Sequence, residues 1–129
     1  MHLLLDTHAW LWLVAAPERL SVDARALLES SDTRLYLSAA SAWEMSIKQE
    51  LGRLELGGSA EIVVPELMLR SDVAAMSITH QHALRAGALP PHHRDPFDRL
   101  LISQAQLEDL PIMTADAVFA RYDIERIAC

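Results

Sequence analysis

With 129 residues, the chain is long enough to bury one hydrophobic core but too short for two ordinary domains, so we expect residues 1–129 to form a single domain. A hydrophobic content of 51% with only four glycines excludes a disordered chain, and the longest apolar run, residues 9–16, is far shorter than the roughly 20 residues of a membrane span. The formal net charge of −7 argues against tight nonspecific binding to nucleic acid, although divalent cations bound to clustered carboxylates would offset part of it.

The first half of the chain predicts two strands and four helices. Residues 2–6 read as a buried strand and residues 7–16 as a helix that stops at Pro17. Ser21 is a good N-cap for a helix to about residue 29, with Val22, Ala26 and Leu27 on its apolar face. A second strand over 35–38 precedes a helix that starts at Ser38 or Ser41 and ends near residue 52. A further helix over 59–70 contains Pro65, which marks a candidate break.

The second half alternates strands and helices in the same way. Strands are predicted over residues 73–78, 111–114 and 124–127, and helices over 79–87, 95–108 and 115–122, with a loop at 89–94. Strands that alternate with helices and are uniformly apolar indicate a parallel sheet covered on both faces. We therefore expect a three-layer α/β/α sandwich with a central, mostly parallel sheet of about five strands. In such sheets ligands bind at the carboxyl ends of the strands.

Four acidic residues stand at or near the points where these predicted strands give way to helices. They are Asp6, Glu44, Asp98 and Asp116. If the fold gathers them, their mutual repulsion raises some of their pKa values, and a hard cation such as Mg²⁺ or Mn²⁺ relieves it. Each acid also has a structural explanation, because acids are favoured at helix starts and can cap free backbone N–H groups. One metal site would explain the positions of all four acids, whereas capping requires a separate explanation for each. The metal site is therefore the favoured interpretation.

Other polar residues give weaker indications of a function. Lys48 follows Glu44 by four residues, which fits equally a surface ion pair and a phosphate clamp beside a metal. The six histidines lack the His-Glu-x-x-His spacing of a zinc site, so we do not expect a histidine-ligated metal, although His93 or Arg94 could contact a phosphate at the rim. The single cysteine excludes an intrachain disulfide, and no basic leader precedes the first apolar run. Both observations favour a cytoplasmic protein without a membrane partner.

Four segments together resemble the PIN-domain ribonucleases, specifically the VapC toxins of type II toxin–antitoxin systems. The matching segments are Leu-Leu-Leu-Asp6-Thr-His-Ala-Trp-Leu, Ser-Ala-Trp-Glu44-Met-Ser-Ile-Lys, His-Arg-Asp95-Pro-Phe-Asp98-Arg-Leu-Leu-Ile and Pro-Ile-Met-Thr114-Ala-Asp116. The resemblance implies a metal-dependent endoribonuclease that leaves a 5′-phosphate and a 3′-hydroxyl. It also implies a homodimer and a cognate antitoxin whose tail fills the groove.

Within that resemblance, Asp6 and Asp98 would be the primary ligands of Mg²⁺ or Mn²⁺, and Glu44 and Asp116 would orient water or a second ion. Auxiliary roles fall to Asp95, Thr114 and Lys48. Two other function classes stay open from the sequence. One is a metal-dependent DNase or phosphatase on the same scaffold, and the other is a PIN-like binding module without turnover, in which the acids only stabilise the fold.

Overall fold

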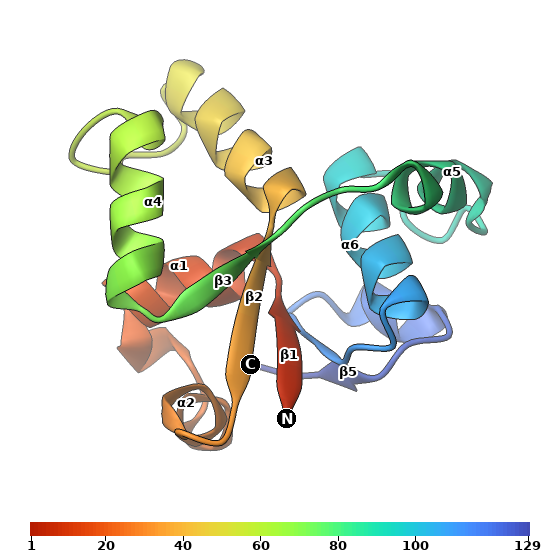
Figure 1. The fold of residues 1–129 in the computed structure, drawn as a ribbon, viewed down its shortest axis with the longest axis horizontal. Coiled ribbons are helices and arrows are strands. Elements are labelled where there is room, and N and C mark those ends of the chain that lie inside the picture. Colours follow the sequence, from red (N-terminus) through yellow and green to blue (C-terminus); the bar gives the residue numbers. More distant parts are fainter.

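A five-stranded parallel sheet forms the centre of the molecule in a computed structural model that describes residues 1–129 (Figure 1). The strand order is β3-β2-β1-β4-β5, and every neighbouring pair is parallel. The strands are β1 (His2–Leu5), β2 (Arg34–Ser38), β3 (Val73–Met76), β4 (Ile112–Met113) and β5 (Arg126–Ile127). The predicted parallel α/β sheet is confirmed, although β3, β4 and β5 are shorter than the sequence suggested.

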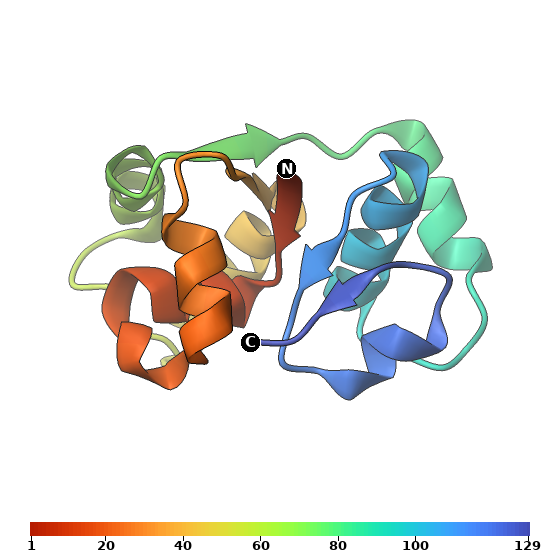
Figure 2. The same ribbon diagram turned by 90° about the horizontal axis from the view of Figure 1, so that it is seen from below.

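Helices cover both faces of this sheet. In Figures 1 and 2, α1, α2 and α4 lie on one side and α5, α6 and η2 on the other, while α3 lies between α4 and α6 and contacts both. The helices are α1 (Thr7–Ala15), α2 (Val22–Glu29), α3 (Ala39–Glu50), α4 (Ala60–Arg70), α5 (His80–Ala88) and α6 (Pro96–Leu107), with short 3₁₀ helices η1 (Pro17–Arg19) and η2 (Ala117–Arg121). None of them combines the length and the apolar character that crossing a membrane requires.

Two hydrophobic clusters, one on each face of the sheet, explain why β1 is apolar at successive positions. Side chains alternate between the two faces of a strand, so Leu3 and Leu5 join one cluster while Leu4 joins the other. The first cluster contains the buried Trp10 of α1, and the second contains the buried Phe119 of η2. Because both faces of β1 are buried, the central strand is fixed rigidly, and so is the residue that follows it.

Local capping signals set most helix starts. The Ser21 hydroxyl accepts from the backbone N–H of Ala24, as predicted. The helix α3 begins after Ser38, whose hydroxyl accepts from the N–H of Ala40, so Ser38 rather than Ser41 is its cap. Pro65 lies inside α4 without ending it, so the candidate break is absent.

The predicted apolar face of α2 is confirmed only at Leu27, which packs against the first cluster, whereas Val22 and Ala26 are exposed. Val22 is 85% exposed, whereas the buried residues of this helix are Ala24 and Leu28. Those two residues are four apart and therefore lie on the same side of the helix, facing the first cluster. The structure also differs from the prediction over residues 115–122, where the only helix is the 3₁₀ helix η2.

Candidate metal and catalytic site

Asp6 directly follows the central strand β1 and is almost completely buried. It occupies the N-cap position of α1, but its side chain makes no capping hydrogen bond, although the backbone N–H of His8 lies near it. Instead its Oδ2 accepts a 2.6 Å hydrogen bond from the hydroxyl of Thr114, which follows β4. The simple capping explanation therefore does not account for Asp6, because its carboxylate is turned toward the neighbouring strand end.

Glu44 reaches the same region from α3, about one and a half turns after the end of β2. Its Oε1 accepts a 2.7 Å hydrogen bond from the hydroxyl of Thr7, and its Oε2 lies 3.0 Å from the Nζ of Lys48. The spacing of Ser41 and Glu44 would allow a capping box, but Ser38 rather than Ser41 caps α3, and the Ser41 hydroxyl lies 2.8 Å from that of Thr7. Glu44 is thus a buried acid held by a hydroxyl on one oxygen and an ammonium on the other.

Asp98 lies in the first turn of α6, and Asp95 is the N-cap of that helix. The Oδ1 of Asp95 accepts from the backbone N–H groups of Phe97 and Asp98 at 2.8 and 3.2 Å. In a capping box the Asp98 side chain would in turn accept from the N–H of Asp95, but that N–H donates to His93. Capping therefore explains Asp95 and leaves the Asp98 carboxylate free for another role.

Asp116 follows β4 and combines two roles. Its Oδ1 accepts from the N–H of Val118 at 2.9 Å and so caps η2. Its own N–H donates to Thr114 Oγ1, the same hydroxyl that donates to Asp6. The buried Thr114 therefore links the ends of β1 and β4 and sets the positions of both acids.

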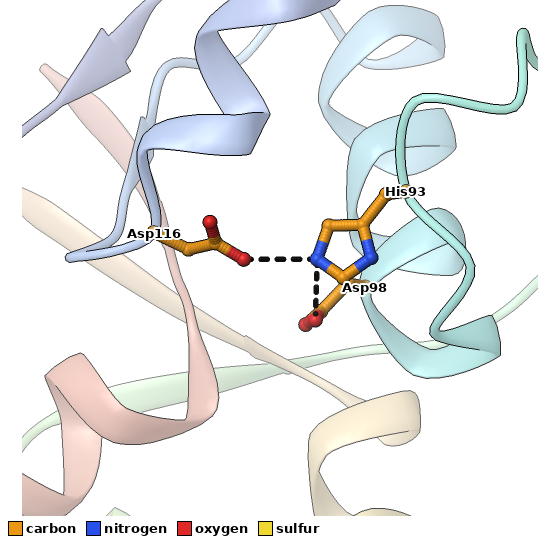
Figure 3. A group of neighbouring side chains, drawn as sticks. All are labelled: His93, Asp98 and Asp116. Carbon is orange, nitrogen blue, oxygen red and sulfur yellow. Dashed lines mark hydrogen bonds and ion pairs between the residues drawn. The ribbon is translucent and has the colours of Figure 1, made fainter.

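His93 completes the site and was not among the site residues predicted from the sequence. Its Nε2 lies 2.9 Å from Asp116 Oδ2 and 3.0 Å from Asp98 Oδ2, between the two carboxylates (Figure 3). These three residues place potential ligand atoms within 4.8 Å of one another, and Asp6 and Glu44 are not part of that group. The sequence suggested His93 only as a candidate phosphate contact at the rim, from its position two residues before the cap of α6.

Asp98 is the acid on which the negative charges of four other acids act. Burial, followed by the negative charges of Asp6, Asp95, Glu44 and Asp116, raises the pKa of Asp98 to about 8. Burial also raises the pKa of Asp6, against the opposing effect of its hydrogen bond from Thr114. The site therefore carries more buried negative charge than its own cations neutralise.

The donor set fits a hard divalent cation. Carboxylate oxygens are the ligands that suit Mg²⁺ and Mn²⁺. Lys48 is the one lysine or arginine in contact with these acids, and it pairs with Glu44 rather than with Asp98. A cation shared by the acids would remove the repulsion that raises the pKa of Asp98.

Other polar and aromatic residues near the site have structural roles. The guanidinium of Arg99 points away from the acids and donates to four backbone carbonyls of α5 and the following loop, those of Ala86, Leu89, Pro90 and His93. Trp10 is buried in the first cluster, as expected for a core residue. Trp43 is 60% exposed and packs edge-to-face on Phe97.

When the sequence is compared with known proteins, it matches one family over most of its length. A family model of the PIN domain matches residues 3–125. Ribonuclease VapC22 of Mycobacterium tuberculosis is 33% identical over 118 residues, which cover 88% of this chain and 85% of VapC22. Ribonuclease VapC16 of the same organism is 37% identical over 68 residues, and this match covers 50% of the chain and about half the length of VapC16, 48%.

Solved structures of other proteins have the same fold as this chain. VapBC2 from Rickettsia felis, bound to a DNA fragment from its promoter, contains a chain with a TM-score of 0.72 and 13% identity, covering 99% of this chain and 98% of that one. FitAcB from Neisseria gonorrhoeae gives a TM-score of 0.62 and 19% identity, with 97% and 96% of the two chains covered.

Proposed function

The chain belongs to the PIN-domain family, and we propose on that basis that it is a metal-dependent endoribonuclease, the toxin of a type II toxin–antitoxin pair. The observation that carries the catalytic part is the position of Asp98, which is partly buried, has Asp116 on the other side of His93 Nε2, and has a pKa raised by its burial and by the charges of acids from other segments of the chain. The similarity to two proteins named ribonucleases supports RNA as the substrate.

In this proposal Asp6, Glu44, Asp98 and Asp116 hold Mg²⁺ or Mn²⁺, with Asp6 and Asp98 as the primary ligands. Such an ion lowers the pKa of a bound water and neutralises charge that develops on the phosphate. Thr114 orients the Asp6 carboxylate. Thr7 and Lys48 fix the two oxygens of Glu44, so that this acid is positioned to accept a proton from the attacking water or to hold a second ion.

The reaction would be hydrolysis at phosphorus. A bond forms between the water oxygen and phosphorus, the bond from phosphorus to the 3′ oxygen breaks, and the leaving oxygen takes up a proton. The products are a 5′-phosphate and a 3′-hydroxyl. The half-exposed Asp116 and the Lys48 side chain lie on the solvent side of the buried acids, where an RNA backbone would approach.

We also propose a protein partner, a homodimer and a cytoplasmic location. The similar solved structures include VapBC, FitAB and toxin–antitoxin complexes, which supports a cognate antitoxin as that partner. The net charge of −7 suits a basic partner segment. The single cysteine is compatible with a reducing compartment.

The substrate class is tested by incubating the purified protein with Mg²⁺ or Mn²⁺ and three substrates of matched concentration. These are a single-stranded RNA, a DNA of the same sequence and a small aryl phosphate. We expect cleavage of RNA alone, with 5′-phosphate ends at the new termini. Cleavage of DNA or the aryl phosphate at comparable rates would instead support the DNase or phosphatase alternative.

Asp6→Asn separates an enzyme from a binding module without turnover. An amide cannot replace a charged ligand, so RNA cleavage should fall by about 100-fold or more. Since the Asp6 side chain makes no capping hydrogen bond, thermal stability without added metal should hold or rise. A loss of stability in that variant would favour a structural role for the acid.

A further inference from the structure

His93 is held in place through its main chain and by the aromatic ring beneath it. Its backbone N–H donates to the hydroxyl of Tyr122 at 2.7 Å, and its carbonyl accepts from Arg99 Nη1 at 2.9 Å. Its ring lies edge-on to the buried Phe119, with 5.7 Å between the ring centroids. The side chain is only 14% exposed. A loop residue fixed at this many points presents its ring to the acids in one orientation.

The hydrogen bonds of the ring determine its tautomer. The backbone N–H of Asp95 donates to His93 Nδ1 at 3.2 Å, so Nδ1 carries a lone pair and no proton. The ring proton is then on Nε2, the nitrogen that faces the carboxylates. Nε2–H donates to Asp116 Oδ2 at 2.9 Å, with Asp98 Oδ2 at 3.0 Å from the same nitrogen (Figure 3).

This tautomer decides between two roles for the imidazole. The distances among His93, Asp98 and Asp116 would suit a metal site with the histidine as a ligand. Coordination, however, requires a lone pair on the nitrogen that faces the ion, and Nε2 has none while Nδ1 accepts from Asp95. Ligation would require the ring to move its proton to Nδ1, which would set two N–H groups against each other at the start of α6.

We propose that His93 is a positioning residue, which donates from Nε2–H to Asp116 and holds that carboxylate beside Asp98 without coordinating the ion. This role rests on the proposed function of the site. Both oxygens of Asp116 then have a protein donor, Val118 N–H on Oδ1 and His93 on Oδ2. The orientation of the Asp116 carboxylate therefore depends on His93, and each of its oxygens keeps a second lone pair that could face an ion or its water.

The first test reads the tautomer directly and needs no substrate. Long-range ¹H–¹⁵N correlation spectra of the histidine rings are recorded for the wild-type protein with EDTA and with saturating Mg²⁺. We expect His93 to show a protonated Nε2 and an unprotonated Nδ1 in both spectra. A proton on Nδ1 with a bare Nε2, or protons on both nitrogens, would overturn the proposal.

The second test compares His93→Gln with His93→Leu in Mg²⁺ affinity by calorimetry and in kcat on RNA. Glutamine can still donate from a position near that of Nε2, so it should stay within about 3-fold of the wild type, whereas leucine should lose about 10-fold or more in kcat, the range for residues that orient metal ligands. His80→Leu, which removes an exposed histidine ring on α5, is the control and should resemble the wild type.

If glutamine and leucine variants lost Mg²⁺ affinity equally, with unchanged unfolding temperatures, His93 would be a ligand and the proposal would be wrong. The proposed function and the proposed role of His93 can be contradicted independently. A wild-type protein that does not cleave RNA would contradict the proposed function, whereas the tautomer and the Mg²⁺ affinities would still decide the role of His93.

Discussion

At the scale of single residues, the site is a set of acids whose partners differ. Asp6 and Glu44 are buried and hydrogen-bonded to threonine hydroxyls, Asp95 is a helix cap, and Asp116 is shared between a cap and His93. Asp98 has no hydroxyl or backbone donor among its contacts and carries the repulsion of the other four. We therefore expect Asp98 to be the residue whose replacement has the most distinctive effects.

Asp98→Asn should separate stability from activity. The amide is nearly the same shape and removes a buried charge that its neighbours repel, so the protein without added metal should become more stable at about pH 8. RNA cleavage should fall by about 100-fold or more, because a ligand of the ion is lost. Thermal unfolding in EDTA and cleavage in Mg²⁺ measure the two effects. Asp123→Asn, a change at an exposed acid, is the control and should alter neither.

The raised pKa of Asp98 also predicts a pH dependence of folding in EDTA. Between about pH 4 and about pH 8 the folded protein keeps a proton on Asp98 that the unfolded chain has released. The free energy of unfolding should therefore fall as the pH rises through this window and level off above it, and the raised pKa of Asp6 acts in the same direction. Urea unfolding at several pH values measures the slope.

Asp98→Asn should reduce this slope, which isolates the contribution of Asp98 from that of Asp6. Saturating Mg²⁺ should also reduce it, because the cation competes with the proton for the carboxylates. A stability that stays constant or rises across the window in EDTA would show that Asp98 is not repelled as described.

How far sequence predicts such residues depends on how local their partners are. The four acids could be singled out because each stands at or near a point where a predicted strand gives way to a helix. His93 was named only as a candidate phosphate contact, because its contacts with Asp116, 23 residues away in sequence, and with Tyr122 could not be predicted. Glu44 was among the predicted acids, but its hydrogen bond from Thr7 could not be predicted, because Thr7 lies on a different helix.

At the scale of elements, the site depends on how strand ends and helix starts are joined. The start of α6 carries Asp95 and Asp98, and the preceding loop carries His93. Arg99 fixes this loop by donating to the carbonyls of Leu89, Pro90 and His93 and, at the end of α5, to that of Ala86. A residue outside the acid cluster therefore holds the segment that presents His93.

Arg99→Met should destabilise the protein by about 1.5–3 kcal/mol, the range for hydrogen bonds from a charged group. It should also lower RNA cleavage, since the loop that holds His93 loses its main donor. Arg85→Met is the matched control on α5, because Arg85 donates only to the side chain of Gln106. Equal unfolding free energies for the two variants, measured in urea, would contradict this role of Arg99.

Element boundaries were predictable where a capping residue or proline marks them, as at Ser21 and Pro96. The buried face of α2 was not, since Val22 is as apolar as Ala24 and Leu28, and only the position of the helix against the sheet selects between them. The ends of β4 and β5 were also missed, because pairing with neighbouring strands, rather than composition, determines the length of a strand.

At the scale of the molecule, the two hydrophobic clusters share one sheet, and β1 contributes to both. We therefore propose that residues 1–129 are one domain that unfolds in a single transition. Far-ultraviolet circular dichroism and tryptophan fluorescence, to which the buried Trp10 contributes, should give coincident urea transitions. Separate midpoints for the two signals would show that the two sides of the sheet unfold independently.

The central claim is that acids from remote segments share one ion, and a Mn²⁺ titration followed by electron paramagnetic resonance tests it most directly. Free Mn²⁺ is measured with the wild-type protein, Asp6→Asn and Asp98→Asn under identical conditions. We expect both variants, altered on different segments of the chain, to bind Mn²⁺ about 10-fold more weakly or worse. Unchanged Mn²⁺ affinity in both variants would contradict a shared ion and, with it, the proposed hydrolysis.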